Sequence, residues 1–344
     1  MQTLRTIALA IGLSALTSVF AGEPLKLVGR TDLPNYSGDF DHFAADVRGK
    51  RLFLAGEDGG TLEVFELESG RHLKTVKGFE APHAIHFMPR SNRLIVTDSG
   101  EGMSKVLDGK TYRVLRAIKL TPGADVIGYD RSRERLWIVT GGKNAKLQLP
   151  YTIVHELDPA SGKRMGQIRF ETNFTESIAV EQNGTRMFVN LSGKSEIAVV
   201  DKTTRRLLAT WPIKEGQHNA PMALDEANKR LFVVTRKPFK LVVLDTGTGA
   251  SIASLEAPER TNELVFDQAN RRLYMAGDGY IGVVEQKDAD HYAEIARVPS
   301  AIGAKTALLV PELQRFYVAV SPGEGRTGGA LLRYDVQPST GQNR

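Results

Sequence analysis

The chain has 344 residues, of which 41% are hydrophobic and 25% charged, a composition typical of a globular protein. It contains no cysteine, which excludes disulfides, Cys-ligated zinc, thiolate nucleophiles and covalently attached c-type haem. The formal net charge of +5 comes from basic residues scattered at regular intervals, and without a dense basic run we do not expect nucleic-acid binding.

The first residues have the pattern of a secretory signal peptide. Arg5 supplies a positive charge, an apolar stretch runs from Ile7 to Phe20, and Val19 and Ala21 stand at the −3 and −1 positions of a cleavage site. Because this stretch is shorter than the about 20 residues that span a bilayer, we expect no transmembrane segment and a periplasmic or secreted protein. The predicted divisions are a signal peptide over residues 1–21, one folded domain over 22–338 and a flexible tail over 339–344.

One short phrase recurs along the chain: an arginine, an apolar residue and then a β-rich run. Neighbouring copies begin 42 to 51 residues apart, the period expected of a propeller blade with four strands. Helical solenoids share this period, but these segments are short, β-branched and aromatic, and bounded by Gly, Asp and Pro. We therefore predict an all-β fold, a single seven-bladed β-propeller with four-stranded antiparallel blades. The copies begin at Arg51, Arg93, Arg135, Arg186, Arg230, Arg272 and Arg315.

The two ends of the chain predict how the ring closes. The last copy supplies the segments Arg315–Val320 and Leu331–Val336 and has no outer strand after them. The segment Leu25–Leu33 lies before the first blade and belongs to none of the seven copies. We predict that this N-terminal strand completes the last blade and leaves no open sheet edge, which favours a monomer. In the second copy the predicted strands are Ala84–Met88, Arg93–Thr97, Lys105–Leu107 and Val114–Leu120.

The repeated phrases also resemble a known family. Runs such as Arg230-Leu231-Phe232-Val233 and turns such as Leu244-Asp245-Thr246-Gly247 resemble the YncE-like family of bacterial propellers, also described as YVTN-repeat or WD40-like proteins. The likeness covers nearly all of the chain after the signal peptide. It implies the propeller fold and an exported protein, and it assigns no activity, because these motifs are strand and turn chemistry.

A ring of polar residues is predicted at one mouth of the central channel, where the inner strands begin. Ten residues before each repeat arginine, six of the seven positions are polar, and two positions later all seven are apolar. The aligned set is Asp41, His83, Asp125, Glu176, Ala220, Asn262 and Lys305, with His42 and Glu263 in the neighbouring register. An alternative is that strand starts are simply exposed and polar, with carboxylates that cap turns.

These residue types suit a ligand or metal site. Asp41, His83, Asp125 and Glu176 offer carboxylate and imidazole donors for a divalent cation, with calcium, zinc, manganese and copper as the candidates. Asn262 and Lys305 would face them across the channel and orient a carboxylate or carbonyl of a bound molecule.

Two long loops are expected on the same face of the ring as the polar mouth. Thr140–Tyr151 and Ser321–Gly329 both connect a second strand to a third, and would bring Lys143, Lys146 and Arg326 to its border. Long loops in compact domains often act as lids or binding loops.

Four functions were weighed from these features. We favour a non-catalytic binding protein whose partner is a small molecule or a periplasmic protein. The second hypothesis is a metal-dependent hydrolase that resembles the gluconolactonase family, with Glu176, Asn262 and Asp125 on the cation, although that family has six blades. A redox propeller that resembles nitrous oxide reductase would need many channel histidines, and the ring offers His83 and His42. Nucleic-acid binding is supported by the charge alone.

Overall fold

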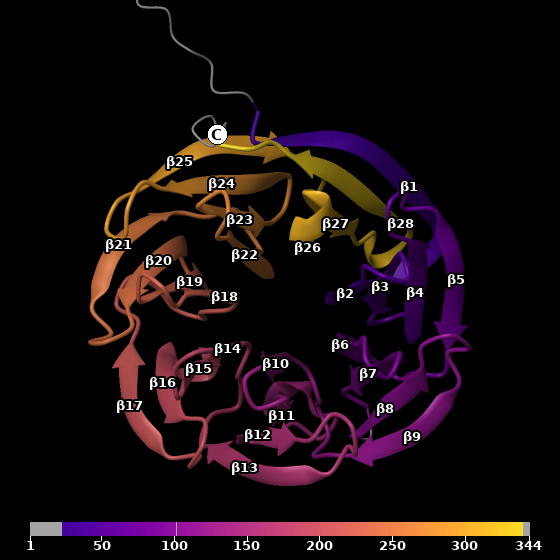
Figure 1. The fold of residues 1–344 in the computed structure, drawn as a ribbon, viewed down its shortest axis with the longest axis horizontal. Helices are drawn as coiled ribbons and strands as arrows, with labels where there is room; N and C mark the ends of the chain where they lie inside the picture. The colour runs from indigo at the N-terminus through magenta and orange to yellow at the C-terminus, as the bar shows by residue number, and fades with distance from the viewer. Residues whose placement is uncertain (1–22, 101, 340–344) are drawn as a thin grey trace, which may run out of the picture.

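Seven four-stranded sheets surround a central channel in a closed ring (Figure 1), as the repeat predicts. The computed structural model describes residues 23–100 and 102–339, so the predicted signal peptide lies outside the described residues. No helix in this described part is long and apolar enough to cross a bilayer. Neighbouring strands within each sheet are antiparallel, for example β6 with β7 and β7 with β8 in the second blade.

The blades follow one another in chain order, and each runs from the channel outward. Blades 1 to 3 contain β2 (Phe43–Asp46), β3 (Arg51–Gly56), β4 (Thr61–Glu66), β5 (His72–Lys77), β6 (Pro82–Met88), β7 (Arg93–Asp98), β8 (Met103–Asp108), β9 (Val114–Lys119), β10 (Ile127–Asp130), β11 (Arg135–Gly141), β12 (Thr152–Leu157) and β13 (Arg164–Phe170). Blades 4 to 6 contain β14 (Ile178–Val180), β15 (Arg186–Leu191), β16 (Glu196–Asp201), β17 (Leu207–Pro212), β18 (Met222–Asp225), β19 (Arg230–Arg236), β20 (Phe239–Asp245), β21 (Ser251–Glu256), β22 (Glu263–Asp267), β23 (Arg272–Ala276), β24 (Tyr280–Gln286) and β25 (Tyr292–Pro299). Blade 7 contains β26 (Thr306–Val310), β27 (Arg315–Val320), β28 (Gly323–Val336) and β1 (Leu25–Gly38), and three single turns of 3₁₀-helix are η1 (Gly142–Asn144), η2 (Ser192–Lys194) and η3 (Pro311–Leu313).

The repeated motif holds the ring together because it forms the second strand of each blade, and both faces of that strand are buried. In blade 1, Leu52 belongs to the apolar cluster shared with blade 7, and the next residue, Phe53, belongs to the cluster shared with blade 2. In blade 3, Leu136 faces blade 2 and Trp137 faces blade 4 in the same way. Successive side chains of a strand point to opposite faces, so adjacent apolar residues serve two neighbouring blades. The described core consists of seven such clusters, one at each blade interface.

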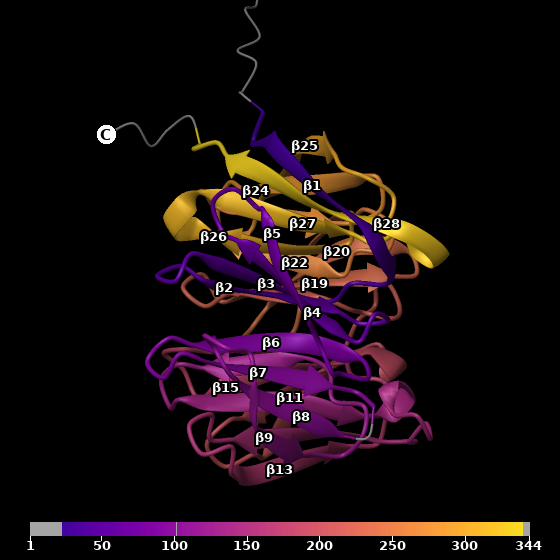
Figure 2. The ribbon, with the colours of Figure 1, turned by 90° about the vertical axis from the view of Figure 1, so that its right-hand side faces the viewer.

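The ring closes through β1, which pairs antiparallel with β28 as the outer strand of the last blade (Figures 1 and 2). Leu25 lies opposite Val336 and Leu33 opposite Gly329, so the predicted closing strand is confirmed. Leu25 enters the cluster between blades 6 and 7, and Leu33 enters the cluster between blades 7 and 1. One strand thereby seals two interfaces.

One prediction about this region is wrong. Ser321–Gly329 was expected to be a long loop, but β28 already begins at Gly323 and pairs with the far end of β1 as far as Gly38. The extra pairing satisfies backbone groups that a loop would leave to solvent. At the other end of β28, Ser339 bonds to Asn270 of blade 6, and residues 340–344 of the predicted tail lie outside the described part of the chain.

The repeat arginines also join neighbouring blades. Arg51 pairs with Asp46 of its own hairpin at 2.5 Å and donates to the carbonyl of Gly109 in blade 2. Arg186 does the same in blade 4, where it binds Glu181 and the carbonyl of Thr246 in the next blade. The positive charge of these two side chains is therefore used inside the fold.

A buried ion pair links blades 3 and 4. The ammonium of Lys202 lies 3.1 Å from Asp130 and also donates to Ser132 and to the carbonyl of Glu181. The side chains of Lys202 and Asp130 are only 2% and 0% exposed, so neither charge can turn to water if its partner is removed.

We predict that Lys202→Met destabilises the protein by about 3–5 kcal/mol, because it leaves the buried Asp130 carboxylate with only the more distant Arg133, at 3.9 Å. The measurement is the midpoint of urea unfolding. The exposed Lys163→Met, the matched control, should change stability by no more than about 0.5 kcal/mol. Adding Asp130→Asn to Lys202→Met should recover part of the loss, and an unfolding midpoint for Lys202→Met equal to that of the control would contradict this account.

Candidate functional site

A cavity of about 500 Å³ opens at the end of the channel where the inner strands begin. All eight side chains that the sequence singled out line it: Asp41, His42, His83, Asp125, Glu176, Asn262, Glu263 and Lys305. Apolar residues of the register two positions further along, among them Phe43, Ile85 and Met222, line the same cavity. The arrangement is therefore a polar wall together with apolar side chains from the channel.

The backbone holds the polar residues in place before the inner strands start. The amide of Asp41 donates to the carbonyl of Ala55, and the amide of His42 donates across the blade boundary to the carbonyl of His83. The amide of Asn262 likewise donates to the carbonyl of Lys305 in the next blade. Since neighbouring blades share these bonds, their side chains are presented to the channel at a fixed spacing.

Hydrogen bonds connect side chains across the cavity. His83 Nδ1 lies 2.7 Å from Asp41 Oδ2, and Asn262 donates to the other oxygen of Asp41 at 3.3 Å. Arg236 continues the chain, because its Nη2 lies 2.8 Å from both Asn262 Oδ1 and Glu176 Oε1. This network joins blades 2, 1, 6, 5 and 4 in that order.

His83 of this network and the neighbouring His42, whose Nδ1 lies 3.2 Å from Glu263 Oε2, are held as imidazolium cations. Burial by itself lowers the pKa of His83, but the carboxylates of Asp125, Asp41 and Glu57 outweigh it and raise this pKa to about 10. Burial likewise lowers the pKa of His42, whereas Asp41 and Glu263 raise it to about 10. In return, His42 and His83 hold the pKa of Asp41 below its usual range, although burial alone would raise it.

Two further carboxyl groups are held partly protonated near neutral pH. Burial raises the pKa of Asp125 to about 7 against the opposing charge of His83, with help from Asp41. The pKa of Glu57 is also raised to about 7, first by burial and then by the nearby carboxylates. Crowded carboxyl groups that retain protons at pH 7 are groups whose protons a cation would displace.

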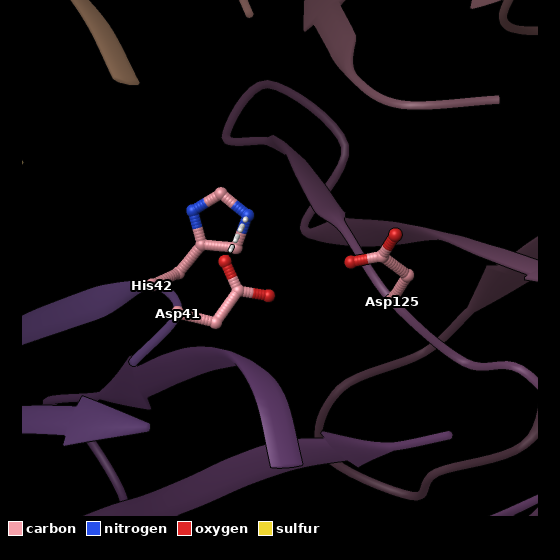
Figure 3. A group of neighbouring side chains, drawn as sticks. All are labelled: Asp41, His42 and Asp125. Carbon is pink, nitrogen blue, oxygen red and sulfur yellow. Dashed lines mark ion pairs between the residues drawn. The ribbon is translucent and has the colours of Figure 1, made fainter. Parts of the chain in front are cut away.

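Within the described chain, two sets of side chains bring possible metal donors within 4.8 Å of one another. One set is Asp41, His42 and Asp125 (Figure 3), and the other is Asp41, Glu57 and His83. Asp41 is common to both and stands beside His42, with Asp125 facing them from blade 3 (Figure 3). Glu176, which the sequence placed among the donors, is in neither set and pairs with Arg236 at 2.8 Å.

Several residues of the cavity wall were not singled out from the sequence. Glu57 and Arg236 each lie six residues after a repeat arginine, at the end of the second strand of their blades, so the same alignment could have found them. Asn144, in the long loop after β11, was also missed, and it donates to Asp125 at 2.6 Å. Its neighbour Lys143, which was expected at the border of the mouth, lines the cavity. The expected mouth residues Lys146 and Arg326 are not among the lining residues.

Comparison with known proteins shows the fold and nothing finer. No protein-family model matches the sequence, and no curated protein matches it. Among many matching solved chains, one from the crystal structure of a mitotic checkpoint complex superposes with a TM-score of 0.71 and 11% identity, over 97% of this chain and 98% of that chain. At this identity the similarity shows a shared propeller architecture.

The pKa directions predict that stability falls as the pH rises. The stabilisation from protonated His42 and His83 is fully present below their ordinary pKa of 6.5 and is lost as the pH rises through about 10. Asp125 and Glu57 act in the same direction at lower pH, because the folded state keeps their protons up to about pH 7 whereas the unfolded state has released them. His86 and His155, whose pKa burial lowers to about 4, act in the opposite direction, but only up to their ordinary pKa of 6.5. The unfolding midpoint should therefore be lower at about pH 9 than at about pH 5.

Histidine NMR signals measure the same effect directly. We expect His42 and His83 to titrate near pH 10, and His86, whose pKa burial lowers to about 4, to be neutral at physiological pH. Asp41→Asn should lower the pKa of His42 and of His83 and leave the pKa of His86 unchanged. Titration of His42 and His83 near their ordinary pKa of 6.5 in the native protein would contradict the ion network.

Proposed function

We propose that this protein is an exported, YncE-like binding propeller without catalytic activity, which binds a divalent cation and a small polar ligand in the mouth cavity. The observation that carries the proposal is the Asp41, His42 and Asp125 donor group, which opens into a cavity of about 500 Å³. Cavities of this size suit small molecules, and a few convergent polar groups fix their orientation. The repeated blade phrases support the YncE-like assignment.

The charge of the cavity wall supports a cationic ligand. Its carboxylates are Asp39, Asp41, Glu57, Asp125, Glu176 and Glu263, and its lysines and arginines are Lys143, Arg236 and Lys305. Lys305 is paired with Asp39 and Arg236 with Glu176, so the remaining four carboxyl groups are balanced mainly by histidines and by their own protons. Two carboxylates and an imidazole are oxygen and nitrogen donors suited to zinc or manganese.

The hydrolase alternative has one observation in its favour, since a carboxyl group with a pKa of about 7, such as Asp125, suits a general base. Against it, the Arg236 guanidinium lies between the oxygens of Glu176 and Asn262, which the gluconolactonase resemblance would assign to the cation. Lactone hydrolysis by the metal-loaded protein would replace the binding proposal with this one.

The metal is tested by elemental analysis of protein purified from the periplasm without chelators or a histidine tag. We expect about one zinc or manganese per chain, and an affinity that rises with pH because bound protons must leave. Asp125→Asn should weaken the affinity by at least about 100-fold, since it removes a donor.

The matched control is Glu176→Gln, which alters a carboxylate of the same wall that lies outside both donor groups. It should retain the metal. Metal content far below one per chain in the native protein, or equal content in Asp125→Asn, would overturn the cation as part of the proposed site.

Export is tested separately by the mass of the protein recovered from the periplasm. We expect the mature chain to begin at Gly22, and Ala21→Arg to block processing because the −1 position accepts only small residues. Lys26→Arg, which lies beyond the cleavage site, should be processed like the native chain. A periplasmic protein that still begins at Met1 would contradict this reading of residues 1–21.

A further inference from the structure

The end of the ring opposite the cavity carries an exposed surface that the proposed function does not use. It consists of the turns that precede the outer strands of blades 2, 3 and 4, together with the first residues of β9, β13 and β17. We call this surface the basic rim. Its apolar side chains are Val114, Leu115, Met165, Leu207 and Leu208, which are 43% to 54% exposed. Its basic side chains are Lys110, Arg113, Lys163, Arg164 and Arg206, all exposed.

The basic rim is continuous from blade to blade. Gly162 in the turn of blade 3 packs directly on β9 of blade 2, since a Cβ at Gly162 would lie 2.8 Å from Nη2 of Arg116. Gly166 of β13 packs in the same way on Arg205 from the turn of blade 4, where a Cβ would lie 2.6 Å from Nε. The outer strands β9, β13 and β17 accordingly follow one another around the ring (Figure 1).

The positive charge of the rim is not neutralised inside the fold. Within the described chain, none of the five basic side chains forms an ion pair, in contrast to Arg51 and Arg186. The three aspartates of these turns, Asp108, Asp158 and Asp201, accept hydrogen bonds from their own turns and are outnumbered by the five basic side chains. Arg116 lies beside these residues on β9, and its Nε and Nη2 are buried with no hydrogen-bond partner among the described residues.

The equivalent positions of blades 5 and 6 show that the fold does not require this charge. Before β21 the turn reads Thr246-Gly247-Thr248-Gly249-Ala250 and contains no charged residue. Before β25 it reads Lys287-Asp288-Ala289-Asp290-His291, in which two aspartates offset the lysine, and Lys287 is paired with Glu285. Basic residues beside exposed aliphatic ones occur in blades 2 to 4, and in blade 1 as Arg71 beside Leu73, and are therefore not a feature of every blade.

We propose that the basic rim docks on an anionic phospholipid surface. Exposed lysine and arginine attract anionic headgroups, and aliphatic side chains beside them insert between the headgroups. A purely polar polyanion offers no apolar environment for these aliphatic side chains. The turns of the three blades all lie at the same end of the ring, so one flat surface reaches them together. Docking in this way leaves the cavity at the opposite end open to its ligand.

The test is co-sedimentation of the mature protein with vesicles of phosphatidylcholine alone or mixed with phosphatidylglycerol. We expect binding only to the anionic vesicles, weaker at high salt. Arg113→Gln, Arg164→Gln and Arg206→Gln should each weaken binding about fivefold. Leu115→Ser and Leu207→Ser should weaken it as well. All five side chains are exposed, so unchanged unfolding midpoints confirm that the variants fold.

Arg271→Gln in blade 6 and Ile252→Ser in blade 5 are the matched controls, exposed at the same end of the ring but outside the basic rim. They should bind like the native protein. Failure of the native protein to bind anionic vesicles at low salt overturns the proposal. Loss of binding in the arginine variants with none in the serine variants also overturns it, in favour of an acidic protein or another polyanion.

Discussion

The fold depends on one constraint: both faces of the second strand of each blade must be buried. Leu52 packs backward on blade 7 and Phe53 forward on blade 2, and the same alternation recurs in every copy of the repeat. A blade alone would leave two apolar faces in water, and an open row of blades would leave one at each end. Only a closed ring removes both. The pairing of β1 with β28 provides this closure, and Leu25 and Leu33 carry it into the two adjacent interfaces.

Closure also creates the site. It brings the starts of seven inner strands to one mouth, so residues far apart in the chain become neighbours, as where Asn262 donates to Asp41. Carboxylates crowded in this way lose water and repel one another. Histidines between the carboxylates reduce this repulsion, and His83 lies 2.7 Å from Asp41 and 3.5 Å from Asp125. An ion network of this kind is poised to exchange protons for a cation, because both stabilise the same carboxylates.

The two ends of the ring are under different constraints. At the cavity end, side chains from different blades share one space, and each must be compatible with the others. At the opposite end, the turns reverse the chain, as where Asp108 accepts from the amide and the hydroxyl of Thr111, and they contact the neighbouring blades mainly through backbone carbonyls and glycines. The remaining turn residues are free to vary, and blades 2 to 4 differ from blades 5 and 6 in charge. Because the fold does not fix these residues, the charge of the basic rim is available for an interaction outside the fold.

The sequence by itself determined the number of blades, the strands of the second blade, the closing strand and the ring of strand-start residues. These follow from a regular period and from local strand and turn chemistry, which the order of residues contains directly. Strand β7 begins at Arg93 and β9 at Val114, both as predicted, whereas β6 and β8 each begin two residues before the predicted start, at Pro82 and Met103. Only the tertiary structure decided that Glu176 pairs with Arg236 and that β28 replaces an expected loop. Each of these depends on distances across the channel or between the chain ends, which a single-blade pattern does not contain.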